Sequence, residues 1–104
     1  MIAYTVRCEI EDAGVAGEWV QWMRGEHLAD VCAAGAIEAT LVRLDLEAAL
    51  TFEARYLFES AEAFERYERE HAPALRAEGL ARFPLERGLR YSRSVGEVLA
   101  RQQP

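Results

Sequence analysis

The sequence predicts a single α+β domain whose elements follow the order β-α-β-β-α-β within 104 residues. Four segments alternate apolar with other residues, which is the period of a strand that buries one face. Two segments repeat their apolar residues every three or four positions, which is the period of an amphipathic helix. With the right-handed rule for crossovers, this order predicts a ferredoxin-like fold. Its four-stranded antiparallel sheet has the order 4-1-3-2 and carries the helices on one face.

The first strand is predicted over residues 2–10. Every second residue there is apolar: Ile2, Tyr4, Val6, Cys8 and Ile10. Since side chains alternate between the two faces of a strand, one face of this strand belongs to the core. The Asp12-Ala-Gly14 segment then ends it.

The first helix is predicted over about residues 16–33. Its apolar stripe consists of Val15, Trp19, Trp22 and Met23. A straight continuation of this stripe would turn Glu26 and Asp30 toward the core. We therefore expect the helix to bend or restart near Gly25 and to end at Gly35.

The two middle strands are predicted over residues 36–46 and 51–59. The earlier strand is apolar on both faces, with Val42, Leu44 and Leu46 on one and Ile37, Ala39 and Leu41 on the other. The later strand divides into Phe52, Ala54, Tyr56 and Phe58 against Glu53, Arg55 and Leu57. Residues 45–50 contain no glycine or proline, so a loose loop is expected there rather than a tight hairpin.

The second helical region begins at Ser60, a typical N-cap residue. Its shared face consists of Phe64, Tyr67, His71 and Leu75. Pro73 should interrupt the helix or start a second one. The last strand is predicted over residues 85–95. Arg87 and Arg93 share its apolar alternation, so part of that face must be wet or paired.

Composition narrows the functional classes. Residues 1–95 are expected to form one ferredoxin-like domain, and residues 96–104 a short polar C-terminal tail. The formal net charge of −6 argues against nucleic acid and anionic membrane surfaces, which need a basic footprint. No apolar run is long enough to span a membrane and no secretory signal opens the chain, so we expect a cytoplasmic protein.

Several kinds of chemistry are excluded by the residues that the chain lacks. It has no lysine and no asparagine, which rules out a Schiff-base lysine and a phosphate-loop lysine. Its two cysteines and two histidines match no metal template. We expect neither a metal nor a cofactor.

The helix-free face of the sheet is predicted to bind a second copy of the chain. On this face, opposite charges on strands one and three should pair. An apolar sector of Ile37, Ala39 and Leu41 is expected beside them, and such residues are poor surface residues. These features predict a homodimer through this face; a solvated outer face is the alternative.

Two Glu-His pairs stand late in the helical regions, Glu26-His27 and Glu70-His71. A histidine beside a carboxylate can act as a general base near neutral pH. If both helices cover one face of the sheet, the histidines meet in one cleft with aromatic walls, the usual form of a small-molecule site. The candidate catalytic residues are Glu26, His27 and His71, and the candidate pocket residues are Tyr4, Trp22, Tyr56 and Tyr67.

The alternative interpretation gives both histidines structural roles. His27 then lies at the surface near a helix end, and His71 bonds a carbonyl freed at the Pro73 break. The stripe of Trp19, Trp22 and Met23 is then core, and Cys8 is an inert buried thiol. No catalytic triad or phosphate loop is recognisable.

Two motifs resemble a bacterial family of uncharacterised proteins, known as a domain of unknown function. The first runs Trp19-x-x-Trp22-Met23-x-x-Glu26-His27-Leu28-x-Asp30-Val31 and is followed by Gly35. The second runs Tyr67-x-x-Glu70-His71-Ala72-Pro73-x-Leu75-Arg76 and closes with Arg82-Phe83. With the strand order, the resemblance covers almost the whole chain.

This family is similar to the wider dimeric α/β-barrel group. That group includes antibiotic-biosynthesis monooxygenases without cofactors, muconolactone isomerases, haem-degrading enzymes and stress-responsive barrels. The resemblance implies a homodimer with two sheets face to face and a pocket between helices and sheet in each subunit. It implies no single reaction. Haem-degrading members use an asparagine beside the pocket, and the absence of asparagine here argues against haem oxygenation.

The sequence leaves the function undetermined between two hypotheses. The first is a small dimeric α/β-barrel module without catalysis that binds a small metabolite or a protein partner. The alternative is a cofactor-independent monooxygenase- or isomerase-like enzyme acting on an aromatic or lactone metabolite, in which His27 or His71 moves protons. An enclosed cavity reached by both histidines would favour the enzyme, and a filled core would exclude it.

Overall fold

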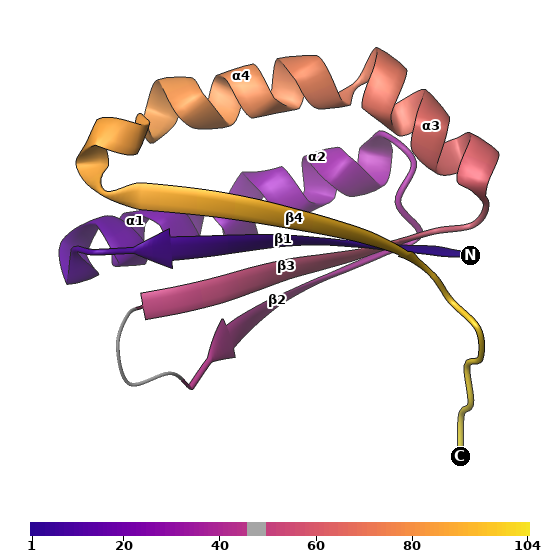
Figure 1. The fold of residues 1–104 in the computed structure, drawn as a ribbon. Helices are drawn as coiled ribbons and strands as arrows, with labels where there is room; N and C mark the ends of the chain where they lie inside the picture. The colour runs from indigo at the N-terminus through magenta and orange to yellow at the C-terminus, as the bar shows by residue number, and fades with distance from the viewer. Residues whose placement is uncertain (46–49) are drawn as a thin grey trace.

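The predicted strands and helical regions are present in the computed structural model, which describes residues 1–45 and 50–104 (Figure 1). In chain order the elements are β1 (Ile2–Ile10), α1 (Ala13–Trp22), η1 (Met23–His27), α2 (Leu28–Ala33), β2 (Glu38–Leu44), β3 (Leu50–Phe58), α3 (Ala61–Glu70), α4 (Ala72–Arg82), η2 (Leu85–Arg87) and β4 (Leu89–Glu97). The strands form an antiparallel sheet in the order β2-β3-β1-β4. This is the predicted order 4-1-3-2 read from the other edge, so the ferredoxin-like topology is confirmed. The predicted facing of Leu46 and the loop between the middle strands fall on residues 46–49, outside the described residues.

The helices cover one face of the sheet, and the core lies between these two layers (Figure 1). The strand register aligns the inward residues, so that Cys8 of β1 lies between Phe52 of β3 and Tyr91 of β4. Trp19 and Phe58 are the largest of the fully buried side chains. Burying a large apolar side chain contributes about 1.5–3 kcal/mol, so this layer supplies most of the stabilising contacts. The predicted inward face of β1 is confirmed.

The first helical region changes its hydrogen-bond pattern where a bend was expected. At the end of η1 the N–H of Leu28 bonds the carbonyl of Met23, five residues back, which makes η1 a π-helical turn. A π-turn takes up one residue more than an α-turn, so the inward stripe moves by one position. The stripe would have continued through Glu26. Instead it continues through His27 and the fully buried Val31.

The second helical region is divided near Pro73, as the sequence predicted. The Ser60 hydroxyl accepts a hydrogen bond from the N–H of Ala63 at 3.1 Å and so caps α3. Pro73 lies in the first turn of α4, where its missing N–H costs no helical bond. Ala72 at the joint is completely buried, so the joint itself packs against the core.

The prediction for the facing of β2 is wrong. Ala39 lies opposite Tyr56, and Leu41 lies opposite Ala54; directly opposed residues of an antiparallel pair share one face. Ala39 and Leu41 therefore pack against the core on the helix side, and Ile37 precedes the strand with half of its surface exposed. Because both faces of this strand are apolar, the alternation could not decide which one turns toward the helices.

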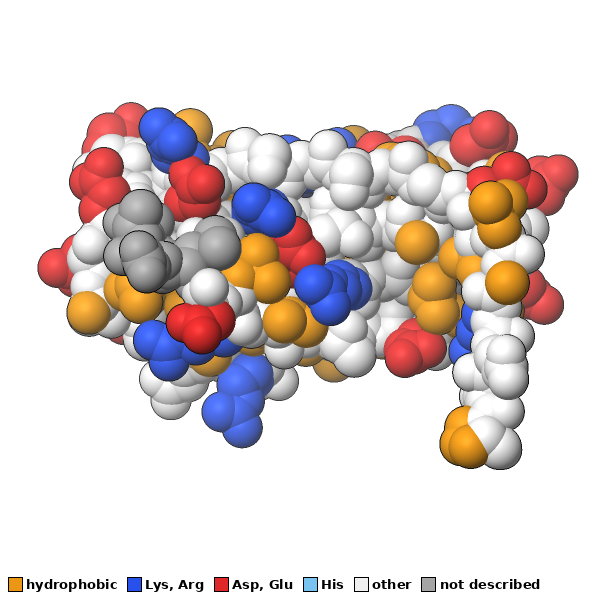
Figure 2. All heavy atoms as spheres, turned by 60° about the horizontal axis from the view of Figure 1, so that its bottom comes forward, with side chains coloured by type: hydrophobic (Ala, Val, Ile, Leu, Met, Phe, Trp, Pro, Cys, Tyr) orange, Lys and Arg blue, Asp and Glu red, His pale blue; other side chains and the backbone are white. Residues whose placement is uncertain are grey.

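The apolar residues of the helix-free face instead lie at its two ends: Val42 and Leu44 at one end, and Leu57, opposite Glu38, at the other. Between them, the Glu53 carboxylate accepts hydrogen bonds from Arg7 at 2.9 Å and Arg55 at 2.8 Å. The predicted charge pair between β1 and β3 is thus confirmed. The hydrogen bonds from Arg55 and Arg7 hold the pKa of Glu53 below its usual range. Figure 2 looks toward this side, where apolar and charged side chains are interspersed.

The last strand, Leu89–Glu97, lies later than the predicted residues 85–95. Gly88, with a φ of +90°, turns the chain from η2 into the strand. Arg87 therefore lies before the strand and forms an ion pair with Glu18 at 2.8 Å. The end of β4, predicted as part of the tail, pairs with β1.

Two glycines allow a matched test of these backbone assignments. Gly17 lies inside α1 with open space where a Cβ atom would stand, so Gly17→Ala should stabilise the protein by about 1 kcal/mol. At Gly88 a Cβ would lie 3.1 Å from a Glu11 carboxylate oxygen and φ is +90°, so Gly88→Ala should destabilise it by about 1–2 kcal/mol. Urea denaturation measures both changes. The same sign in both variants would contradict the assignments.

Candidate functional site

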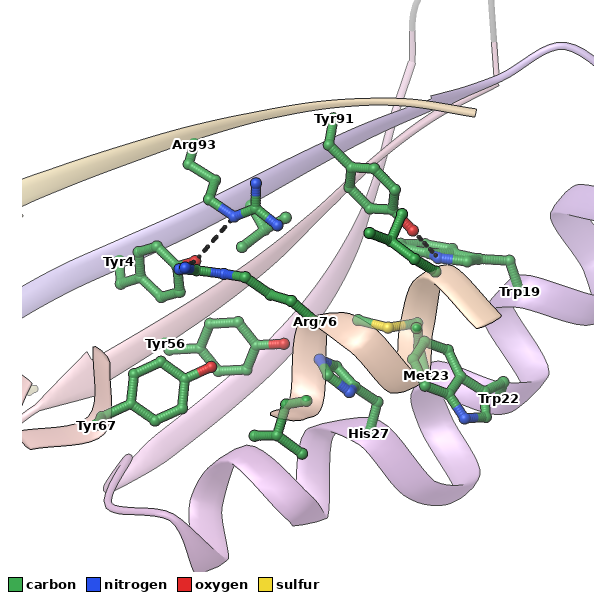
Figure 3. A pocket seen from close by; sticks show the side chains of 14 residues that line it. Tyr4, Trp19, Trp22, Met23, His27, Tyr56, Tyr67, Arg76, Tyr91 and Arg93 are labelled. Carbon is green, nitrogen blue, oxygen red and sulfur yellow. Dashed lines mark hydrogen bonds between the residues drawn. The ribbon is translucent and has the colours of Figure 1, made fainter. Parts of the chain in front are cut away.

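A cavity of about 130 Å³ lies between the sheet and the helices, where η1 and α4 face the strands (Figure 3). Its aromatic lining consists of Tyr4, Trp19, Trp22, Tyr56, Tyr67 and Tyr91. The structure therefore brings together all four candidate pocket residues named from the sequence. None of the described residues that line the cavity is acidic.

Stacked rings build one side of the cavity. The Tyr4 ring centroid lies 5.8 Å from that of Tyr56 and 6.2 Å from that of Tyr67. Phe64 of α3 packs against Tyr4 with a centroid distance of 5.2 Å. Each such pair contributes about 0.5–1.5 kcal/mol beyond its buried area, so the rings form a rigid wall.

His27 and Trp22 form another part of the lining. Their rings stack with a centroid distance of 4.7 Å and an interplanar angle of 29°. The imidazole points from η1 into the cavity (Figure 3). Its Nδ1 atom is buried and has no hydrogen-bond partner among the described residues. The π-turn that carries His27 inward thus delivers a polar atom that the protein itself leaves unbonded.

Burial lowers the pKa of the His27 imidazole below its ordinary value, and the nearby Asp30 carboxylate offsets part of this effect. The ring is therefore neutral near pH 7. A neutral imidazole has one nitrogen that donates and one that accepts a hydrogen bond. It is able to take a proton from a bound molecule.

The tyrosine hydroxyls of the cavity stay protonated. Burial raises the pKa of Tyr67 to about 12, and it raises the pKa values of Tyr56 and Tyr91 as well. The Tyr91 hydroxyl accepts a hydrogen bond from Trp19 Nε1 at 3.0 Å. The hydroxyls of Tyr56 and Tyr67 have no side-chain partner within the described residues, and so remain available to a ligand.

Two arginines of the cavity were not predicted from the sequence. Arg76 Nη2 donates to the Tyr4 hydroxyl at 3.1 Å and to the Glu68 carboxylate at 2.8 Å. Arg93 Nε donates to the same hydroxyl at 3.1 Å. The sequence does indicate that Arg93 faces inward, because it shares the inward alternation of the last strand. No sequence pattern indicates this for Arg76, since arginines on helices usually point to water.

His71 and Glu26 lie outside the cavity. His71 is exposed at the joint of α3 and α4, where its φ of −122° takes it off the inward helical face. Glu26 is exposed because the π-turn rotates it outward, and it pairs with Arg82 at 3.3 Å. The predicted cleft shared by two histidines is therefore not formed, and His27 alone reaches the cavity.

Other candidate chemistries find little support in residues 1–45 and 50–104. No three His, Cys, Asp or Glu side chains among them are grouped to hold a metal ion. No helix of this part is long and apolar enough to cross a membrane. Cys8 and Cys32 are free thiols. Burial raises the pKa of the Cys8 thiol to about 12, so it is not a reactive thiolate near pH 7.

The family model of a domain of unknown function, DUF4286, matches residues 1–90. The chain therefore belongs to this family. No curated protein matches the sequence significantly.

Solved structures share the fold at low sequence identity. A dimeric ferredoxin-like protein from an uncultured marine organism superposes with a TM-score of 0.73 at 13% identity, over 100% of both chains. HapK from Hahella chejuensis gives a TM-score of 0.72 at 14% identity, over 100% of this chain and 98% of its own. SnoaB from Streptomyces nogalater, described as a cofactor-independent oxygenase, gives 0.66 at 14%, over 98% and 94%. At these identities the likeness establishes the fold and no activity.

The state of His27 is open to direct titration. Its imidazole should titrate below the ordinary pKa of 6.5, because burial favours the neutral form. The unfolded chain then takes up this proton first. The contribution of His27 to stability is therefore complete above about pH 6.5 and is lost as the pH falls through the folded pKa. NMR titration of the His71→Gln variant, which retains one histidine, gives the value. A midpoint at or above 6.5 would contradict a buried neutral ring.

Proposed function

We propose that this protein binds a small aromatic molecule in the cavity and that His27 accepts a hydrogen bond or a proton from it. The observation that carries the proposal is the buried Nδ1 atom of His27, which lacks a partner among the described residues. A buried polar atom without a partner costs about 1–3 kcal/mol. A ligand donor at this atom would recover that cost.

The size of the cavity supports a molecule of one ring. Its volume is about 130 Å³, and an engineered cavity of about 150 Å³ in another protein holds benzene. The rings of Trp22 and Tyr56 line the cavity with apolar surface, and the hydroxyls of Tyr56 and Tyr67, which have no side-chain partner among the described residues, offer donors. An apolar lining with a few convergent polar groups is the usual form of a small-molecule site.

A second candidate is catalysis by the same site, as in a cofactor-independent monooxygenase or isomerase acting on an aromatic or lactone metabolite. The neutral state of His27 favours it, since a general base must be unprotonated. His27 would take the proton of a phenol, or of a carbon beside a lactone carbonyl. The electron pair would stay on the substrate, and the Tyr56 and Tyr67 hydroxyls would stabilise the anion. SnoaB, which shares the fold, is described as a cofactor-independent oxygenase.

We further propose that two copies pair through their helix-free faces. Val42 and Leu44 supply apolar contact area at one end of this face, and Leu57 supplies it at the other end. Arg7 and Arg55 share the Glu53 carboxylate, so each charged side chain of this network has a partner, and the net charge of +1 would remain at the rim of the interface. A similar structure is described as a dimeric ferredoxin-like protein. A stable interface of this kind should bury at least about 1,000 Å² in total.

We also propose a location in the bacterial cytoplasm. Cys32 is exposed and free, which fits a compartment that keeps thiols reduced. Two proteins of the same fold come from Hahella chejuensis and Streptomyces nogalater.

Phenol is a suitable probe for the cavity. In ¹H–¹⁵N NMR spectra it should shift the Trp22 indole signal saturably, with a dissociation constant of about 1 mM or lower, equivalent to about −4 kcal/mol. Val6→Phe should weaken binding at least about tenfold, because Val6 lines the cavity and a larger ring would occupy it. Val95→Phe is the matched control, since Val95 is 55% exposed and does not line the cavity.

The binding proposal fails if none of the one-ring probes phenol, benzamide and benzoate shifts the indole signals of the wild-type protein. It also fails if Val6→Phe and Val95→Phe bind phenol equally well while both keep the circular dichroism spectrum of the wild type.

The dimer proposal has its own matched pair. Leu57→Glu should shift the protein from dimer to monomer in sedimentation velocity, since it would bury an unpaired negative charge in the interface, opposite Glu38. Leu85→Glu makes the same change at a side chain that is 52% exposed and lies in η2, off the sheet; this variant should remain a dimer. A monomeric wild type at micromolar concentration would refute the proposal.

A further inference from the structure

The geometry points to an anionic ligand. Resting on the proposed function of the cavity, we infer that its ligand is a small aromatic acid whose carboxylate is bound by Arg93 and the Tyr4 hydroxyl.

The charge of the cavity lining favours an anion. Two arginines, Arg76 and Arg93, contribute to it, and none of its described residues is acidic. Arg76 is neutralised from outside by Glu68, whose carboxylate oxygens lie 2.8 and 3.0 Å from its Nη2. Arg93 has no carboxylate partner within the described part of the chain. The cavity therefore holds one uncompensated positive charge, although the protein as a whole has a net charge of −6.

The position of Arg93 on the sheet is unusual for a charged residue. It lies opposite Val6 on the face of β4 that turns toward the helices, where an apolar residue would be expected. Its guanidinium stands 5.8 Å from the Tyr91 ring centroid. The side chain extends from β4 into the space between Tyr4 and Tyr91 (Figure 3). Arg93 is exposed as a whole, so it stands where a ligand arriving from solvent would meet it.

The hydrogen bonds at the Tyr4 hydroxyl leave donors for a ligand. Its hydroxyl oxygen accepts from Arg76 Nη2 and from Arg93 Nε, each at 3.1 Å. Both lone pairs are thereby used, so its own proton is left to donate. Arg93 donates its Nε–H to this bond, and its two Nη groups remain able to donate to another acceptor. The hydroxyl proton and the Nη groups together form a set of donors that have no acceptor among the described residues, and a carboxylate would supply one.

The two ends of the cavity then assign the parts of the ligand. The carboxylate lies at Arg93 and Tyr4. The ring lies among the aromatic side chains, and a ring substituent able to donate a hydrogen bond reaches His27. The cavity volume of about 130 Å³ restricts this acid to about one ring. A hydroxybenzoate-like molecule combines these features.

Benzoate, its neutral isostere benzamide, and phenol separate the inference from the function on which it rests. Each is titrated by NMR into wild type and into Arg93→Gln. Benzoate should bind the wild type at least about tenfold more tightly than benzamide, the effect expected of a charged hydrogen bond. Arg93→Gln should remove this preference for benzoate over benzamide, while titration with phenol shows whether the aromatic part of the site is still formed. Arg90→Gln is the control, because Arg90 lies on the same strand but pairs with Glu9 on the other face.

Each possible result of these titrations tests a different part of the inference. If benzamide and phenol bind as tightly as benzoate, and Arg93→Gln changes none of the three, the anion inference is wrong and the aromatic site stands. If none of the three probes binds the wild type, the proposed function fails and the inference fails with it. If Arg90→Gln weakens benzoate binding as much as Arg93→Gln, the effect is one of overall charge and the assignment to Arg93 is wrong.

Discussion

The single π-helical turn between α1 and α2 is the constraint on which the rest of this site depends. The apolar residues before and after it lie on stripes that differ by one position, and a regular α-helix cannot bury both. One extra residue in the turn resolves the conflict, because it brings Val31 into the core and keeps Glu26 and Asp30 in water. The same rotation carries His27 inward against Trp22. The π-turn therefore causes both the packing of the helix against the core and the placement of His27 in the cavity.

The break in the second helical region serves packing instead of chemistry. There the joint buries Ala72 and leaves His71 at the surface, while Pro73 begins the new helix at no cost in hydrogen bonds. α4 then runs back over the sheet and brings Arg76 to Tyr4. Two irregularities that look alike in the sequence, each with a Glu-His pair, therefore have opposite consequences for their histidines.

Much of this arrangement could be predicted from the sequence, and the failures have physical causes. The order of the elements and the right-handed crossover rule predicted the sheet order, the alternation of β1 predicted its buried face, and the conflict of stripes near Gly25 located the turn. The facing of β2 was unpredictable, because Val42 and Leu41 are equally apolar and only pairing with β3 distinguishes their sides. The pairing of Arg93 with Tyr4 crosses from β4 to β1 and depends on register. The prediction for His71 was wrong because the apolar period in the sequence runs on past Pro73, whereas the helix in the structure is broken there and its inward face does not continue.

The site requires that the π-turn present the His27 ring to the aromatic cavity. Nuclear Overhauser contacts from the His27 ring protons measure this in solution. The stacking at 4.7 Å between ring centroids predicts strong Overhauser contacts from the His27 ring protons to the Trp22 indole protons. A surface side chain that rotates freely would not give them. Absence of the Trp22 contacts would mean that the helix passes Gly25 in another register and that the cavity has no histidine.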